Sequence, residues 1–250
     1  MGKILYKGEI NIVAGNVTQV SEGTGGAEGR LTRASLTLNI WDPESREEVK
    51  TYLTANAWNS KNRNMADRAK KAIRRGDFFV FVCGELEEDT PATDGTPRLK
   101  ANIIDFQRNW KREFVEGDNR KTVLVANIGA IDIKEDKTIV RLPIDVWSKE
   151  TSSSETQWIG VSFKNGKAKG AAKLEVGAPV AILGGKIHET VVEERNATYY
   201  NMAGFEFIKG YKNKKEESAN GTPSNGNSFQ ENVEPSDFAE LDIDDSDLPF

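Results

Sequence analysis

An internal repeat constrains the fold of this chain more than any other feature of its sequence. The segment Leu36–Trp41 (LTLNIW) has the same pattern as Leu142–Trp147 (LPIDVW). The spacing from Leu86 to Phe106 equals that from Ile187 to Phe207, twenty positions in each case. Between these matches, two glycines flank an apolar segment in each half: Gly76 and Gly84, then Gly177 and Gly185. Matches in the same order predict two diverged copies of one module.

The two copies are expected to join near residues 109–120, where charged residues and Gly117-Asp118-Asn119 interrupt the strand pattern. Residues 212–236 are rich in Asn, Gly, Ser and Glu and cannot bury enough apolar surface to offset the entropy of ordering. That stretch is predicted to be a disordered linker. The predicted domains are therefore residues 1–112, 118–211, 212–236 (linker) and 237–250 (acidic tip).

Each copy shows alternation typical of five strands, with a short helix after the third. In the first copy Asn64 and Asp67 favour a helix start, and Gly76 is expected to close it. In the second copy Gly166 and Gly170 weaken the helix. This order predicts an all-β protein made of two tandem OB folds, five-stranded Greek-key barrels. The strands are expected near 7–20, 31–42, 47–59, 77–87 and 97–107, then 121–134, 137–148, 155–164, 178–189 and 197–209.

Aromatic residues alternate with core residues and are predicted to face solvent. Leu36, Leu38 and Ile40 share one parity, whereas Trp41 lies among polar residues on the other. Exposed rings can stack on nucleic-acid bases, and a dimer interface or rim contact is the alternative. Phe163 has core parity and ranks below Trp158. The candidate stacking residues are Trp41, Tyr52, Trp58, Trp147 and Trp158.

Basic residues near these rings are candidates for contacts with phosphate groups, although a solvated surface is the simpler interpretation of any single lysine. They are Arg33, Lys61, Arg63, Arg141, Lys164 and Lys167.

No pattern indicates catalysis, a cofactor or a metal site. His188 and Cys83 are single residues of their kinds, too few for a usual zinc site. With one cysteine there is no intrachain disulfide, which favours a cytoplasmic location. Neither a signal peptide nor a membrane span is expected.

The charge is divided unevenly along the chain. The whole sequence carries −5, yet residues 216–250 hold ten acidic residues and no Lys or Arg. The other 215 residues hold all 34 Lys and Arg against 29 Asp and Glu, a net charge of +5. A basic body with an acidic tail suits a polyanion binder with a separate recruitment arm.

The last residues combine acidic side chains with an apolar ending that could fill a basic-rimmed pocket on a partner. They closely resemble the C-terminal tip of bacterial single-stranded DNA-binding proteins, and Asn127-Ile128-Gly129 resembles that family's first-strand motif. The diverged repeats favour a phage or mobile-element version, with a chromosomal origin left open. The predicted docking residues are Asp244, Asp245, Asp247, Leu248, Pro249 and Phe250.

The resemblance implies a non-enzymatic protein that coats single-stranded DNA in replication, recombination and repair. It also implies a homodimer, because two chains with two OB domains each supply the four domains found in tetrameric members of the family. The partners that it implies for the tip are DNA replication and repair proteins. One alternative is an adaptor whose OB domains mainly dimerise. The other is an RNA-binding OB protein, although no residue that would recognise the 2′-hydroxyl group of RNA is evident from the sequence.

Overall fold

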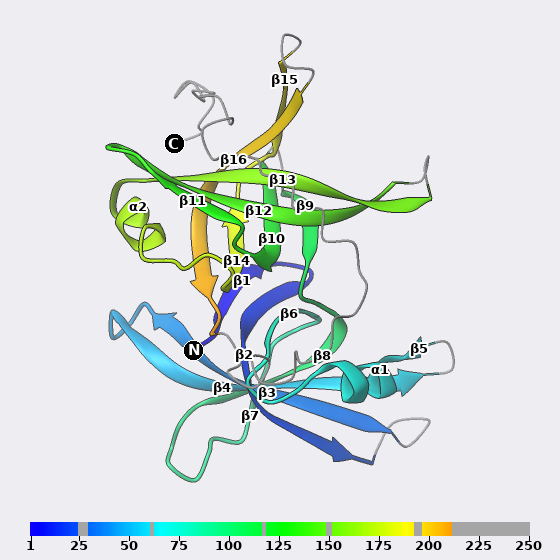
Figure 1. Ribbon diagram of the computed structural model, residues 1–250. Coiled ribbons are helices and arrows are strands. Elements are labelled where there is room, and N and C mark those ends of the chain that lie inside the picture. The colour runs from blue at the N-terminus through cyan, green and yellow to red at the C-terminus, as the bar shows by residue number, and fades with distance from the viewer. Residues whose placement is uncertain (25–29, 61–62, 117–118, 149–151, 193–196, 212–250) are drawn as a thin grey trace, which may run out of the picture. The chain divides into compact units, whose positions relative to one another are not determined.

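The computed structural model describes residues 1–24, 30–60, 63–116, 119–148, 152–192 and 197–211. Over these residues the chain is mostly β-strand with two short helices, and its strands form two five-stranded barrels (Figure 1). The predicted fold class is confirmed. The predicted linker and acidic tip lie outside the described residues. Within the described ranges, no helix is long and apolar enough to cross a membrane.

The first barrel is formed by β2 (Asn11–Gly23), β3 (Leu31–Asp42), β4 (Glu47–Ser60), β6 (Phe78–Cys83) and β8 (Arg98–Gln107). Neighbouring strands follow the order β2–β3–β4–β8–β6, and β6 pairs with β2, so the ring closes. The pairing of β4 with β8 is parallel and the other four are antiparallel. The short strands β5 (Arg63–Asn64) and β7 (Glu87–Asp89) pair with β4 and β8.

The second barrel repeats this order with β10 (Asn119–Asn127), β11 (Ala130–Ile133), β12 (Lys137–Ser148), β13 (Ser153–Lys164), β14 (Pro179–Gly184) and β16 (Ala197–Lys209). Its first strand is split into β10 and β11 at Ile128-Gly129, and β13 pairs in parallel with β16. The strand β15 (His188–Val192) pairs with β16 as a hairpin.

Side chains at every second position of the strands point inward and fill each barrel. Leu36, Leu53 and Phe81 are fully buried in the first, and Leu142, Ile159 and Phe163 in the second. Each side chain of this size contributes roughly 1.5–3 kcal/mol when it is fully buried. The core position predicted for Phe163 is confirmed, because the β12–β13 register contains no bulge that would turn the ring outward.

A helix follows the third strand of each barrel. The helix α1 (Met65–Ala72) packs Met65 and Ala69 into the first core. The prediction that the Asn64 side chain caps it is wrong: Asn59 accepts hydrogen bonds from the backbone N–H groups of Ala66 and Asp67, at 2.9 and 3.3 Å. The predicted stop at Gly76 is also late, because α1 ends at Ala72 and residue 73 is already extended.

The second helix, α2 (Asn165–Ala171), forms despite its glycines. Ala171 is fully buried in the second core, so tertiary packing holds the segment that propensity disfavours.

An additional strand precedes each barrel. The strand β1 (Lys3–Lys7) pairs with β2, and β9 (Trp110–Glu116) pairs with β10. The prediction that residues 109–120 break the strand pattern is therefore wrong. Charged residues on the outer parity hid the alternation, whereas Trp110 and Phe114 pack against a third apolar cluster.

This third cluster joins the two barrels. It contains buried residues of β2 and β6 together with residues of β10 and β14, so those strands are buried on both faces. The rings of Tyr6 and Phe114 stack with centroids 4.7 Å apart. All six residues of β6 are buried, which accounts for its unbroken apolar sequence FFVFVC.

Candidate nucleic-acid interface

The outer face of the first barrel carries three aromatic side chains along the β3–β4 hairpin. Trp41 is 60% exposed, and Tyr52 and Trp58 are half-buried. Tyr52 lies opposite Thr37 and Trp58 lies opposite Leu31, so the three rings occupy positions four and six residues apart along β3. These intervals correspond to about 13 and 20 Å of strand. The predicted outward orientation of the three rings agrees with the alternation of buried and accessible residues in both strands.

Tyr52 lies among basic side chains. The ammonium nitrogen of Lys50 lies 4.8 Å from the centre of the Tyr52 ring. In the parallel β4–β8 pair, Tyr52 is in register with Arg98 and Thr54 with Lys100. Lys100 forms an ion pair with Glu87 at 3.2 Å, whereas the Arg98 side chain has no ion pair with another described residue. A ring flanked by cations is suited to stacking a base whose phosphate must also be neutralised.

The indole of Trp58 is held in place by β8. Its Nε1–H donates a hydrogen bond to Oδ1 of Asn102 at 3.0 Å. Arg33 lies across the hairpin from Asn56, two pairs along from Leu31 and Trp58 and so on the same face. Because this bond fixes the ring in advance, stacking on it requires little further loss of side-chain entropy.

Trp41 has a different setting at the far end of the hairpin. It lies opposite Glu48 and next to the β3 end residue Asp42, which pairs with Glu47, and the adjoining turn contains Glu44 and Arg46. The Asp42 carboxylate accepts hydrogen bonds from the Ser45 hydroxyl and from the backbone of Glu44 and Ser45, and these bonds lower the pKa of Asp42. This end of the hairpin is therefore acidic, unlike the end that carries Tyr52 and Trp58.

The second barrel exposes both of its candidate tryptophans. Trp147 is 65% and Trp158 is 45% exposed, on the outer parity of β12 and β13. Trp158 lies opposite Pro143, and its ring covers Gly129 so closely that a Cβ atom at Gly129 would overlap it. Gly129 belongs to the Asn-Ile-Gly element of the sequence, and its lack of a side chain makes room for the indole.

Two predicted phosphate contacts of the second barrel are occupied by acidic partners. Arg141 donates from Nε to Oδ2 of Asp132 at 2.9 Å, and its side chain is only 13% exposed. Lys167 pairs with Glu206 at 2.7 Å, and Lys3 pairs with the same carboxylate at 3.0 Å. Burial raises the pKa of Glu206, but its bonds to the two lysines outweigh that effect and lower the pKa overall.

The remaining predicted basic residues differ in accessibility. Arg63 is exposed in β5, and Arg33 and Lys164 are half-buried. Lys61 lies outside the described residues. The structure thus brings Arg33 to the same face as Trp58 and places Lys167 in an ion pair at the start of α2.

Sequence reasoning missed the contribution of β8 to this face. Arg98, Lys100 and Asn102 alternate with the inward residues Leu99 and Ala101, so the period-two pattern was available. It was not decisive, because the pattern does not reveal that β8 pairs in parallel with β4.

Comparisons with known proteins add little to this geometry. No protein-family model matches the chain, and no curated protein matches its sequence. Among solved structures, the wild-type single-stranded DNA binding protein from Thermus aquaticus is similar, with 12% identity over 82% of this chain and 93% of the other, at a TM-score of 0.26. A deletion mutant of that protein gives 14% identity, 82% and 94% coverage, and the same TM-score of 0.26.

Proposed function

We propose that the chain binds single-stranded DNA without regard to base sequence and protects it during replication, recombination and repair. The observation that carries this proposal is the outer face of the first barrel, where Tyr52 and Trp58 lie beside Lys50, Arg98 and Arg33. Stacking on an aromatic ring contributes about 1–3 kcal/mol per base, and every base offers a π-face. The rings therefore supply affinity without sequence preference, and the cations supply the phosphate contacts.

Duplex DNA is a poor ligand for such a face, because its bases are already stacked and cannot reach the rings. Binding to a single strand should weaken with added salt, since counterions are released as phosphates are neutralised. Trp147 and Trp158 extend the stacking surface to the second barrel in this proposal. Arg63, exposed in β5 beside the end of β4 that carries Trp58, would follow the backbone there.

A fluorescence titration tests the proposal directly. Poly-dT is expected to quench tryptophan emission and to bind far more tightly than a duplex of equal length. The salt dependence of each titration separates stacking from charge attraction. Equal affinity for the two nucleic acids, or binding without quenching, would contradict the stacking mechanism. Competition with poly-U distinguishes DNA from RNA as the preferred strand.

The acidic tip is proposed to recruit DNA-processing proteins. Asp244, Asp245 and Asp247 would attract a basic rim, while Leu248-Pro249-Phe250 would fill an apolar pocket on the partner. Deleting residues 242–250 should abolish partner binding and leave DNA binding intact or tighter, because a competing polyanion is removed. If the deletion abolishes DNA binding, the proposal that the barrels bind DNA and the tip binds only partner proteins is wrong.

The assembly is proposed to be a homodimer in the cytoplasm, with four OB barrels in total. This rests on the resemblance of the tip and repeats to single-stranded DNA-binding proteins. Light scattering of the full chain at several concentrations checks it, and a stable monomer would refute it.

The neutralised cations of the second barrel favour a second candidate function, that of an adaptor. In that case Arg141 and Lys167 stay with their carboxylate partners, and the barrels serve mainly to dimerise while the tail recruits enzymes. The adaptor predicts little or no binding of poly-dT by the full chain, so the titration above also decides between the two.

A further inference from the structure

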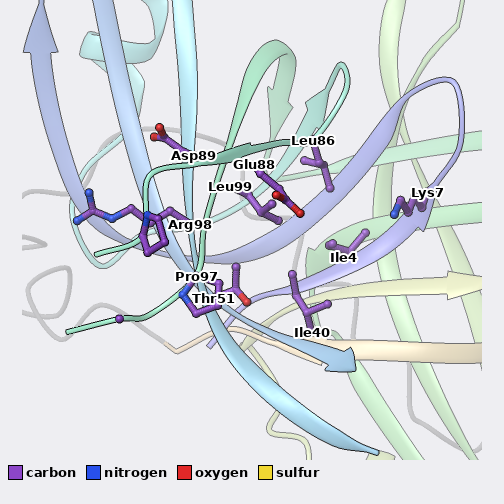
Figure 2. A pocket seen from close by; sticks show the side chains of 12 residues that line it. Ile4, Lys7, Ile40, Thr51, Leu86, Glu88, Asp89, Pro97, Arg98 and Leu99 are labelled. Carbon is purple, nitrogen blue, oxygen red and sulfur yellow. The ribbon is translucent and has the colours of Figure 1, made fainter. Parts of the chain in front are cut away.

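A cavity of about 470 Å³ lies at one end of the first barrel (Figure 2). The helix α1 is attached near the other end, where the Thr32 hydroxyl donates to the carbonyl of Ala66 at 2.9 Å. The cavity is lined instead by Ile40 and Thr51, which lie eight and six positions further along the same hairpin than Thr32. Its volume falls within the range of small-molecule sites, about 300–1,000 Å³.

The cavity has an apolar floor and a charged rim. Ile4, Ile40, Leu86 and Leu99 supply the floor from four separate segments (Figure 2). Two cations and two carboxylates stand around it: Lys7, Arg98, Glu88 and Asp89.

These charged groups form few hydrogen bonds or ion pairs with other described residues. The side chains of Lys7, Glu88 and Arg98 form no hydrogen bond or ion pair with another described residue. Asp89 accepts a single bond, from the backbone N–H of Thr90 at 2.9 Å. The rim can therefore offer both a donor for an anion and an acceptor for an amino group to the same ligand.

The cavity adjoins the proposed stacking face. Arg98 lines it and is also in register with Tyr52 across the β4–β8 pair. Thr51, the neighbour of Tyr52 in β4, lines it from the inner side. A strand that stacks a base on Tyr52 and places a phosphate at Arg98 would therefore lie next to residues that line the cavity.

We propose that this cavity receives one base of the bound strand, turned out of the stack beside Tyr52, and that it adds a preference for a base with an exocyclic amino group to stacking that is otherwise independent of sequence. The proposal rests on the proposed single-stranded DNA binding. The flat base lies on the apolar floor, its amino group donates to Glu88 or Asp89, and the adjoining phosphate lies near Arg98 and Lys7. Cytosine, adenine and guanine carry such an amino group, and thymine does not.

The test compares oligo-dC with oligo-dT of equal length, because both are pyrimidines with similar stacking area. The full chain is titrated at a pH above 7.5, so that cytosine stays neutral. The readout is the ratio of the two affinities. In the Glu88→Ala/Asp89→Ala variant, the preference for dC over dT should fall by about fivefold or more.

A matched control removes two carboxylates from the same hairpin without touching the cavity. Glu85→Ala/Glu87→Ala should strengthen both complexes alike and leave the ratio unchanged. Leu86→Trp, which reduces the cavity at its half-buried edge, should lower the ratio as the first variant does.

Each outcome has a separate meaning. If the wild-type chain binds neither oligomer, the proposed function fails. If it binds both, but the ratio is the same in wild type and in Glu88→Ala/Asp89→Ala, the cavity does not hold a base. If Leu86→Trp instead weakens binding of a labelled peptide spanning residues 242–250 and leaves the ratio unchanged, the cavity is a peptide site and the proposal is overturned.

Discussion

The two barrels share a fold but differ in how particular cations on their outer faces are paired. In the first, Lys50 lies over the ring of Tyr52, and Arg98 stands beside it without an ion pair to another described residue. In the second, Arg141 is bonded to Asp132 and shielded from solvent. The rings show the reverse trend, since Trp147 and Trp158 are more exposed than Tyr52 and Trp58.

This difference shows which constraints a duplicated domain retains. The inward positions are apolar in both copies, because a cavity or a buried polar group there costs several kcal/mol. The outward positions carry no such penalty and are free to diverge. We therefore expect the first barrel to provide most of the affinity for single-stranded DNA.

The largest effect is expected when the aromatic pairs are removed from one barrel at a time. Tyr52→Ala/Trp58→Ala should weaken binding of poly-dT by a hundredfold or more, since each stacked base contributes about 1–3 kcal/mol and cations flank these rings. Trp147→Ala/Trp158→Ala should weaken it by about tenfold. Both are measured by anisotropy of a labelled oligonucleotide, with thermal unfolding as the check on folding. An equal loss for both variants would remove the proposed asymmetry.

The next effect concerns the way the second barrel holds Trp158. Gly129→Ala places a methyl group where the indole lies and should destabilise the protein by about 1–3 kcal/mol or displace the ring. Urea unfolding measures the loss of stability, and the tryptophan emission spectrum reports displacement of the Trp158 ring.

Gly166→Ala is the control, because no atom lies within 4 Å of a Cβ at that position. It should stabilise the protein by about 0.4–1 kcal/mol, because alanine lowers the conformational entropy of the unfolded chain at a position that is helical in the folded state. Destabilisation by Gly166→Ala, or no change in either property with Gly129→Ala, would contradict the packing described here.

A smaller effect should follow from weakening the ion pair of Arg141 with Asp132. Asp132→Asn keeps an acceptor for the guanidinium but removes the opposing charge, so a phosphate competes with a weaker partner for Arg141. Affinity for poly-dT should rise, and the slope of log affinity against log salt should steepen by about 0.7. Glu135→Gln removes the same charge from an exposed neighbour and should leave the slope unchanged. A slope equal in both variants would show that Arg141 does not reach the strand.

The smallest perturbation uses Cys83 as a reporter of the first barrel alone. Burial raises the pKa of its thiol to about 12, so the reactive thiolate is scarce. Labelling in native buffer should be negligible and should appear only as the first barrel opens in urea. Because the folded pKa lies above the ordinary 9.0, this group favours folding most below pH 9, and its contribution is lost as the pH rises towards 12. Rapid labelling of the native chain at pH 8 would contradict this burial.

Much of the fold could be predicted from local pattern. The matched segments predict the repeat, and alternation along single strands predicts the barrel strands. The same alternation predicts the sides on which Trp41, Trp147 and Phe163 lie. The structure agrees with these predictions. The strand β9 was missed because its outer residues are charged and obscure the alternation. The cap of α1 was missed because Asn59 comes from the preceding strand, five residues before the expected cap.

The sequence by itself determined the repeated barrel and the inward or outward direction of residues in the strands with clear alternation, because a strand's period of two is a local property of the pleat. Only the tertiary structure decided which cations stand beside which rings. Arg98 is placed beside Tyr52 by a parallel pairing between residues 46 positions apart in the chain, and Arg141 is held by Asp132 on a neighbouring strand. Such pairings depend on how the barrel closes, and no local pattern contains that information.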